Sequence, residues 1–250
     1  MIPAEHSPAF RALFDLYNRR YLLPRAFRRI DLYGSLDAGV ERDRPILYIA
    51  NHSSWWDGLL LFHLWRRSGE DRHYVMMDEE QLAKYRFFRK LGAYSVDKSG
   101  PGASRSSLRY TEGLLGQSSR VWLFPQGDIR HLESRPLALR RGAAHLLRRV
   151  PHAAVVPVTF YYTQGLHSKP EASLEIGRPL LEDWAASDRE DVMALLQGKL
   201  QRQLDRHRER EIAAVDDPAS APRPDRELLR TGLSVNEKFD RARGGRRAAH

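Results

Sequence analysis

Short apolar runs alternate with longer amphipathic stretches between about residues 46 and 177. The runs have the length and composition of buried strands, and the stretches between them carry apolar residues at helical spacing. Strands are expected at 46–50, 74–76, 94–96, 121–124, 155–162 and 174–176, and helices at 54–67, 79–90, 106–115 and 137–149. This alternation predicts a single α/β domain with a mostly parallel or mixed central sheet flanked by helices.

The first 34 residues carry a different pattern. Phe10, Phe14 and Tyr17 recur at helical spacing among arginines, and Pro24 interrupts the segment. Such an amphipathic helix can lie in the headgroup region of a membrane, and it can equally pack on its own domain. We therefore expect residues 1–34 to form an N-terminal amphipathic helical segment, with both roles open.

The C-terminal part begins with a last helix and ends in a polar tail. Ser187 and Glu190 have capping-box spacing, so this helix is expected to start there. Toward the C-terminus, large apolar residues become rare among Pro, Ala, Asp and Arg, which predicts a disordered basic tail over residues 211–250. The globular domain is then expected over residues 35–210.

The chain has 250 residues, a formal net charge of +9 and no cysteine. The lack of cysteine excludes disulfides, thiolate zinc sites and a cysteine nucleophile, and it fits a cytosolic context. The charge favours an anionic partner, such as a lipid surface or nucleic acid. Because the arginines are spread along helices and the tail without a recognisable binding motif, nucleic acid is disfavoured.

The distribution of apolar residues indicates where in the cell the protein is expected. No apolar run approaches the roughly 18 residues that a spanning helix needs, and the N-terminus has no apolar core of the signal-peptide kind. Together with the positive charge and the amphipathic first segment, this predicts a cytoplasmic protein that is peripheral on the inner face of the cell membrane.

The candidate chemistry lies directly after the first strand of this domain, in the stretch Asn51-His52-Ser53-Ser54-Trp55-Trp56-Asp57-Gly58. Residues five apart on one helix point roughly 140° apart, so His52 and Asp57 can meet only if His52 lies in the turn and Asp57 in the first helical turn. Ser53 and Ser54 are plausible helix caps there. Asp57 could then fix the tautomer of His52 and leave the other ring nitrogen as a general base. A single pair at this spacing is also common by chance.

Four short blocks stand in order along the domain, at residues 51–57, 92–98, 124–130 and 155–158. In order, spacing and strand context they resemble the lysophospholipid and glycerol-phosphate acyltransferase superfamily, to which 1-acylglycerol-3-phosphate acyltransferases belong. The blocks of that family usually read Asn-His-x4-Asp, Gly-x-x-Phe-Ile-Asp-Arg, Phe-Pro-Glu-Gly-Thr-Arg-Ser and an apolar pair followed by Pro-Val. The resemblance covers about residues 35–180 and implies the glycerol-phosphate acyltransferase-like fold.

The resemblance implies direct transfer of a fatty acyl group from acyl-CoA or acyl-carrier protein to a hydroxyl of a lysolipid-type acceptor, as in phospholipid biosynthesis. His52 would take the proton of the acceptor, and Asp57 would orient His52. Backbone N–H groups at a helix start or in the Gly127 turn would stabilise the oxyanion. No metal or cofactor is implied. The alternative of another class is an inactive relative that binds membranes or carries lipid.

The resemblance also assigns acceptor binding, to Asn51, Lys98, Gln126, Gly127, Asp128 and Arg130. Four positions depart from the family pattern, because Gln126, Asp128, Ile129 and Lys98 stand where glutamate, threonine, arginine and arginine are usual. Lysine and isoleucine lack the planar fork of arginine, although Lys98 and Arg130 could still hold a phosphate between them.

The identity of the acceptor therefore stays open. An added carboxylate at Asp128 would repel a phosphate dianion, which favours a zwitterionic lysolipid or a non-phosphate acceptor such as a carotenoid glycoside, glycolipid or aminolipid. Gln126 can both donate to and accept from hydroxyl groups, which suits a polyol or a sugar. Alternatively, Asp128 points to solvent or pairs with Arg130, and the choice of acceptor is unchanged.

Overall fold

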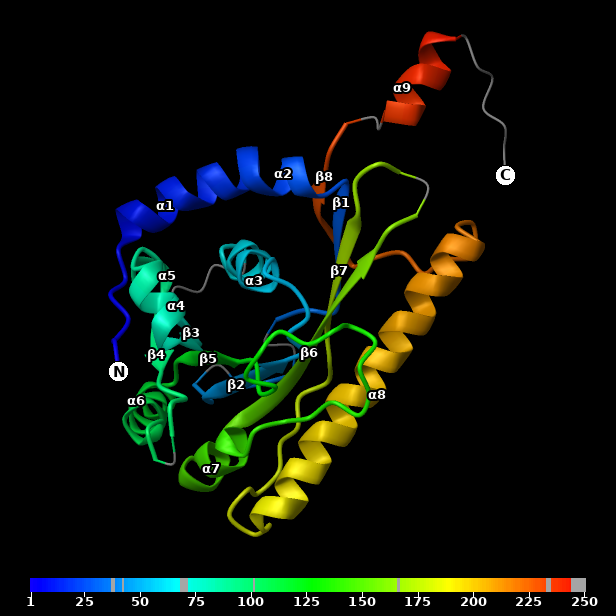
Figure 1. The fold of residues 1–250 in the computed structure, drawn as a ribbon. Coiled ribbons are helices and arrows are strands. Elements are labelled where there is room, and N and C mark those ends of the chain that lie inside the picture. Colours follow the sequence, from blue (N-terminus) through cyan, green and yellow to red (C-terminus); the bar gives the residue numbers. More distant parts are fainter. Residues whose placement is uncertain are drawn as a thin grey trace.

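A mixed β-sheet forms the centre of the protein, with helices on both of its faces (Figure 1). The computed structural model describes residues 1–36, 39–41, 43–67, 72–100, 102–165, 167–232 and 235–243. Within these ranges the sheet has eight strands in the order β4-β3-β5-β2-β6-β7-β1-β8. The strands are β1 (Arg29–Tyr33), β2 (Ile46–Ala50), β3 (His73–Asp78), β4 (Ala93–Val96), β5 (Arg120–Leu123), β6 (Ala154–Thr163), β7 (Glu171–Ile176) and β8 (Arg226–Arg230).

The helices are α1 (Pro8–Tyr17), α2 (Leu23–Ala26), α3 (Asp57–Trp65), α4 (Glu79–Lys84), α5 (Phe88–Leu91), α6 (Arg105–Gly116), α7 (Gly142–Arg149), α8 (Arg189–Asp216) and α9 (Val235–Ala242), with one π-helical turn, η1 (Asn18–Leu22). Strands β4, β3, β5, β2 and β6 are parallel to one another. β7 is antiparallel to β6, and β1 is parallel to β7 but antiparallel to β8. The expected mixed sheet flanked by helices is confirmed.

The apolar strand β2 divides the core into two layers. Ile46, Tyr48 and Ala50 belong to the cluster that includes α2 and α3, whereas Leu47 and Ile49 belong to the cluster that includes α6, α7 and α8. This arrangement follows from the strand period, because successive side chains point to opposite faces of a sheet. Both faces of β2 are covered, which is why its sequence is continuously apolar.

Pro24 does not interrupt the N-terminal segment, contrary to the sequence-based expectation. α1, η1 and α2 follow one another without a break, as a rod that lies over α3 (Figure 1). Pro24 lies in the first turn of α2, where a missing backbone N–H and a fixed φ are tolerated. The π-helical turn directly before it keeps the helical path continuous.

Three expected helices begin or end elsewhere. The helix expected at 79–90 is divided into α4 and α5, and the one expected at 137–149 starts only at Gly142. The last helix is capped by Asp188 rather than Ser187, because the Asp188 carboxylate accepts from the N–H groups of Glu190 and Asp191, both at 2.8 Å.

The expectation of a disordered tail over residues 211–250 is wrong for most of its described part. Residues 211–216 continue α8, and β8 pairs with β1, with Leu228 9% exposed. β1 itself was missed, and without β8 it would be an edge strand with unpaired backbone groups. The sheet therefore includes one strand that precedes residue 35 in the sequence, β1, and one that follows residue 210, β8. Residues 244–250 lie outside the described residues.

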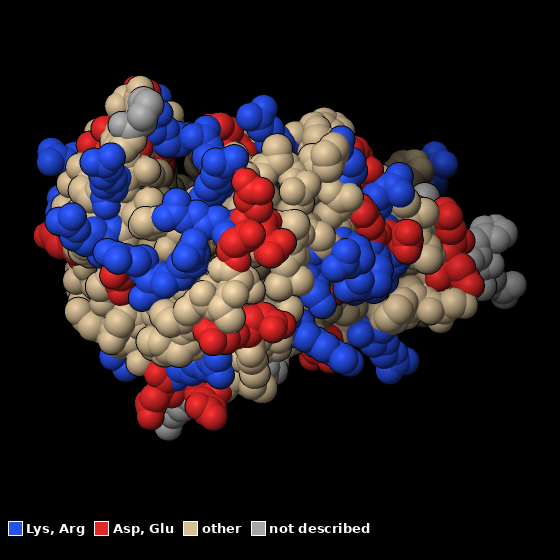
Figure 2. Space-filling model, turned by 90° about the horizontal axis from the view of Figure 1, so that it is seen from below, with Lys and Arg blue, Asp and Glu red and all other residues tan. Residues whose placement is uncertain are grey.

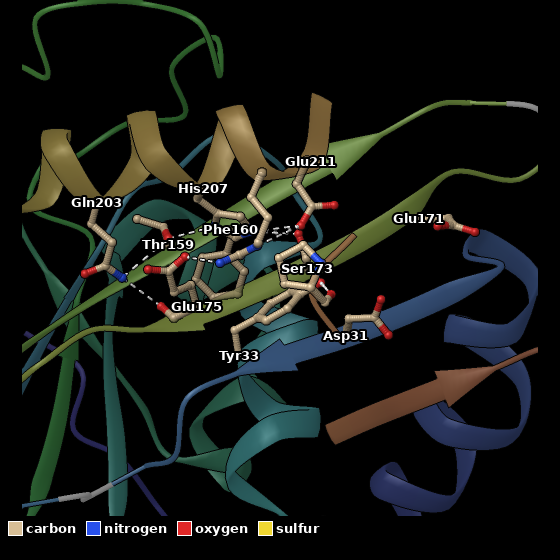
Figure 3. A network of polar contacts seen from close by, with 12 residues as sticks. Asp31, Tyr33, Thr159, Phe160, Glu171, Ser173, Glu175, Gln203, His207 and Glu211 are labelled. Atoms are coloured by element: carbon tan, nitrogen blue, oxygen red, sulfur yellow. Dashed lines mark hydrogen bonds and ion pairs between the residues drawn. The ribbon is translucent and has the colours of Figure 1, made fainter. Parts of the chain in front are cut away.

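A buried polar network fastens α8 to the sheet (Figure 3). The ring of His207 lies between two hydroxyls, with Nδ1 2.7 Å from Thr159 Oγ1 and Nε2 2.7 Å from Ser173 Oγ. One turn earlier, Gln203 Nε2 donates to the Glu175 carbonyl at 2.9 Å. The sequence predicted this helix but not the polar network that it forms. His207 is fully buried, which gives it a packing role rather than access to a substrate.

Candidate active site

His52 and Asp57 meet at the carboxyl end of β2. His52 lies in the turn between β2 and α3, and Asp57 is the first residue of α3. His52 Nδ1 is 2.8 Å from Asp57 Oδ2, which also accepts from the backbone N–H groups of Ser53 (2.8 Å) and Ser54 (3.0 Å). Of the two expected caps, Ser54 accepts from the Trp56 backbone N–H with its Oγ at 3.2 Å, in the turn that leads into α3. The backbone of both serines also binds the carboxylate.

The second oxygen of Asp57 is held from the other side of the site. Tyr162, near the end of β6, donates its hydroxyl to Asp57 Oδ1 in a short hydrogen bond. Burial, and next the nearby Asp57 charge, raise the pKa of Tyr162 well above its ordinary value, so this tyrosine remains a donor. Sequence reasoning missed Tyr162, because it lies 105 residues from Asp57 and belongs to none of the four blocks.

The tautomer of the His52 ring follows from these contacts. Asp57 Oδ2 accepts from two backbone N–H groups and lies 2.8 Å from His52 Nδ1, so Nδ1 is the ring nitrogen that donates to it. In the neutral ring, Nε2 then carries the lone pair. No hydrogen-bond partner for Nε2 is found among the described residues. The ring stacks on Phe124 with a centroid distance of 4.4 Å and lines a cavity, so its free nitrogen is placed where a substrate hydroxyl could reach it.

The cavity beside His52 has a volume of about 800 Å³, within the range of small-molecule sites. Its apolar wall comes from both layers of the core. On one side it is lined by Phe62, Trp65, Val75, Phe88 and Leu91, and on the other by Met76, Leu108, Leu123 and Ala143. Such a wall suits a hydrocarbon chain.

Asn51 does not reach this cavity, although acceptor binding was expected of it. Its side chain is 1% exposed and bonds to both backbone groups of one residue on β6. Oδ1 accepts from the Phe160 N–H at 2.8 Å, and Nδ2 donates to the Phe160 carbonyl at 3.1 Å. These bonds continue the pairing of β2 with β6 by one residue and fix the start of the turn that carries His52.

Gln126 and Arg130 likewise lie outside the lining of the cavity. Gln126 is 6% exposed, and its Oε1 accepts from the His52 backbone N–H at 2.7 Å. The Arg130 backbone N–H donates to the His52 carbonyl at 2.9 Å, while its exposed guanidinium is 3.9 Å from Asp128. The third block therefore holds the backbone of His52 on both sides. The contacts of Gln126 and Arg130 in the structure are thus with the backbone of His52, and their binding of an acceptor stays a prediction.

Lys98 and Asp128 do line the cavity, and they are paired with each other at 2.8 Å. Lys98 also bonds to Asp78 Oδ2 at 2.9 Å, and Asp128 also bonds to Arg140 at 2.9 Å. Burial alone would lower the pKa of Lys98, but its hydrogen bonds to Asp128 and Asp78 outweigh burial and raise it. Hydrogen bonds from Lys98 and then Arg140 lower the pKa of Asp128, so the cluster is ionised at neutral pH.

Gly127 completes this cluster through its backbone. Its carbonyl accepts from Lys98 Nζ at 3.0 Å, and its N–H donates to the Phe124 carbonyl at 2.9 Å. Because that N–H is already used, it does not serve as the oxyanion donor that was expected in this turn. Gly127 has φ +80°, and a Cβ there would lie 2.1 Å from Arg140 Nε. Glycine is needed for Arg140, which the sequence did not single out, to cross the turn.

Comparisons with known proteins agree with this site. The model of a family described as "Acyltransferase" matches residues 34–161, just over half of the chain. The chain therefore belongs to the acyltransferase family. No curated protein matches it by sequence.

A solved structure gives the fold a precedent. The crystal structure of the 1-acyl-sn-glycerophosphate (LPA) acyltransferase PlsC from Thermotoga maritima aligns with a TM-score of 0.56 at 16% identity. The match covers 78% of this chain and 79% of that chain. At this level of identity the likeness establishes a shared fold, and the substrate of this chain has to be argued from its own residues.

Proposed function

We propose that this protein transfers a fatty acyl group from a thioester donor, acyl-CoA or acyl-carrier protein, to a hydroxyl of a lipid-type acceptor. The observation that carries this proposal is the His52–Asp57 hydrogen bond of 2.8 Å, which occupies Nδ1 of a histidine that lines a largely apolar cavity. A neutral imidazole in this tautomer can accept a proton from a weakly acidic hydroxyl.

The chemical steps follow from this placement. His52 Nε2 takes the hydroxyl proton of the acceptor as its oxygen attacks the carbonyl carbon of the thioester. The buried Asp57 carboxylate stabilises the imidazolium that forms. The tetrahedral intermediate then collapses with cleavage of the C–S bond, and the leaving thiolate takes the proton from His52. No bond to the enzyme forms, and no cofactor is required.

We infer that the protein works at a membrane surface. Within the residues searched, none of the helices has the length and apolar character needed to cross a membrane. α1 presents exposed apolar side chains, namely Leu13 (64% exposed), Leu16 (47%) and Tyr17 (45%), and the exposed Arg19 and Arg20 follow directly in η1. This pattern suits a helix that lies in the headgroup region, from which a lipid acceptor could reach the cavity.

A basic surface of the protein suits the negatively charged groups of the acyl donor. Lys and Arg side chains gather on the underside of the molecule, toward the side where α6 and α7 lie (Figure 2). The exposed residues Arg105, Arg109 and Arg141 are sequence neighbours of Ser104, Leu108 and Gly142, which line the cavity. Because CoA and acyl-carrier proteins are anionic, this side favours the approach of the donor.

The test of the proposed function is product identification. Purified protein is incubated with radiolabelled acyl-CoA or acyl-carrier protein and a panel of lysolipids and monoacylated neutral lipids, and the labelled products are analysed. The expected result is an acyl ester that forms at least roughly 100-fold more slowly with His52→Ala, whose circular dichroism stays unchanged. Lipid binding without ester formation in the wild type would instead identify an inactive lipid-binding relative.

A further inference from the structure

We propose that Asp128 is a built-in anion that takes the place of an acceptor phosphate, so that the acceptor presents its hydroxyl on a neutral polyol or sugar headgroup. This inference rests on the proposed function and names the substrate class of the same site. It follows from where the cations of the cavity direct their hydrogen bonds.

Lys98 has no donor to spare for a phosphate. An ammonium group has three N–H donors. In the structure they have three acceptors, the Asp78 carboxylate at 2.9 Å, the Asp128 carboxylate at 2.8 Å and the Gly127 carbonyl at 3.0 Å. A phosphate could bind Lys98 only if it displaced at least one of these oxygens.

The arginines near the site do not replace Lys98 as a ligand for phosphate. Arg140 lines the cavity, but its guanidinium is paired with the other oxygen of Asp128 at 2.9 Å. Arg130 has an exposed side chain outside the cavity lining. Ile129 lines the cavity and is 52% exposed, and it presents a hydrocarbon surface that cannot hold an anion.

The charge of the cavity contrasts with that of the whole protein. The chain carries a net charge of +9, yet its cavity is lined by four carboxylates and only two cations other than histidine. The carboxylates are those of Asp78, Glu80, Asp97 and Asp128, and the cations are Lys98 and Arg140. A phosphate dianion placed here would be repelled by the excess of like charge, whereas a hydroxyl group can donate to any of these carboxylates.

An aromatic surface stands beside the base. Trp55 lines the cavity with His52 and is 59% exposed, which is unusual for so large an apolar side chain. Its ring packs edge-on against Trp56 at a centroid distance of 5.1 Å, which fixes its orientation. A fixed aromatic face of this kind can pack against the apolar face of a sugar ring or a glycerol backbone.

The decisive experiment compares two acceptors that differ only in the phosphate. The value of kcat/KM is measured for 1-oleoylglycerol and for 1-oleoylglycerol 3-phosphate with the same acyl donor, and again for an alkyl glucoside and its 6-phosphate. We expect the neutral member of each pair to be acylated at least 10-fold more efficiently. Equal rates, or a preference for the phosphorylated member, would overturn the inference while leaving the proposed acyl transfer intact.

A matched pair of variants tests the role of Asp128 itself. Asp128→Asn keeps the shape of the side chain and releases Lys98 and Arg140, so the preference should shift toward the phosphorylated acceptor by at least 10-fold. Asp97→Asn removes the same charge from the same cavity without touching these ion pairs, and should shift it by less than 3-fold. Equal shifts in both variants would mean that general charge, and not the pairing of Asp128, sets the preference.

A binding measurement gives a readout without catalysis. The thermal unfolding midpoint of the wild type should not rise with millimolar glycerol 3-phosphate, whereas that of Asp128→Asn should rise with ligand concentration. Stabilisation of the wild type by glycerol 3-phosphate would contradict the inference. Acyl transfer to none of the acceptors would contradict the proposed function instead.

Discussion

At the scale of single residues, two segments of the chain, the turn after β2 and the end of β6, meet at the Asp57 carboxylate. Its two oxygens accept from the His52 ring, from the backbone of Ser53 and Ser54, and from the Tyr162 hydroxyl. A buried carboxylate with four donors has no freedom to turn, and the imidazole that it holds is fixed in both position and tautomer. The precision of the proposed base therefore depends on residues that touch no substrate.

Tyr162→Phe tests this positioning. The variant leaves one oxygen of a buried carboxylate without its donor, so we expect kcat to fall roughly 3- to 10-fold because the ring is held less firmly. The free energy of unfolding should fall by about 1–3 kcal/mol. Steady-state kinetics and urea denaturation measure the two effects.

The neighbouring tyrosine provides the control. Tyr161 lies on the same strand, and its hydroxyl donates to Glu133 at 3.0 Å, away from His52. Tyr161→Phe should leave kcat within about twofold of the wild type, since its hydrogen bond does not involve Asp57. If both variants lowered kcat equally, the effect would be one of strand β6 and not of Asp57.

The sequence predicted that His52 and Asp57 meet, but it did not predict the residues that hold them. His52 and Asp57 are five residues apart, so local geometry was enough to place them in one turn. Asn51 and Gln126, by contrast, were expected to touch the acceptor, and each bonds to a backbone group far along the chain, at Phe160 and His52 respectively. Which long-range backbone group a buried amide will meet depends on strand order, and the sequence pattern does not encode this directly.

At the scale of elements, the strands with continuous apolar runs were predicted from the sequence. The two strands at one edge of the sheet, β1 and β8, were not. β2 and β6 have the apolar content of strands covered on both faces. β1 alternates charged and apolar residues, and β8 reads Arg-Glu-Leu-Leu-Arg, so neither carries such a run. β8 gains its strand structure from the edge of β1, and that edge exists only in the folded protein.

Three buried histidines, on α3, β3 and α8, make the stability of the protein depend on pH. Burial lowers the pKa of His63 to about 4, that of His73 to well below 6.5, and that of His207 below its ordinary value. Below about pH 6.5 the unfolded chain takes up protons that the folded protein does not, so the free energy of unfolding falls on acidification. Asp31 acts in the opposite direction, because burial raises its pKa to about 6, but it is one group against three.

Urea denaturation at pH 7, 6 and 5 measures this dependence. The midpoint should decrease toward pH 5, and the decrease should be smaller in His207→Gln, which keeps a polar side chain but has no group that titrates in this range. A midpoint that is constant or rises on acidification would show that the three histidines are not held neutral in the folded state.

At the scale of the whole molecule, basic side chains and exposed apolar side chains gather on different parts of the surface. Basic side chains gather on the underside of the molecule, toward α6 and α7 (Figure 2). Among the charged residues that line the cavity, by contrast, carboxylates predominate. The exposed apolar residues of α1 lie on the rod that covers α3 (Figure 1). Donor and membrane would thus approach the cavity from different sides, and the sequence alone showed the total charge but not this separation.

Vesicle flotation tests the membrane side. Leu13→Glu/Leu16→Glu places two charges in the exposed stripe of α1 and should strongly reduce binding to anionic vesicles, because it removes apolar area and adds repulsion. Ile212→Glu/Val215→Glu makes the same change at exposed apolar positions of α8 and should reduce binding far less. Equal losses in the two variants would assign membrane binding to net charge and not to α1.

The central claim is that Asp57 contributes to acyl transfer by acting on His52, and a double-mutant comparison of kcat/KM tests it most directly. His52→Ala should lose at least roughly 100-fold, and Asp57→Asn should lose a comparable factor, because the neutral amide no longer holds the tautomer or stabilises the imidazolium. With the base already absent, adding Asp57→Asn to His52→Ala should cost no further activity. If the losses of the two single variants multiplied in the double variant, Asp57 would act independently of His52, and the account would be contradicted.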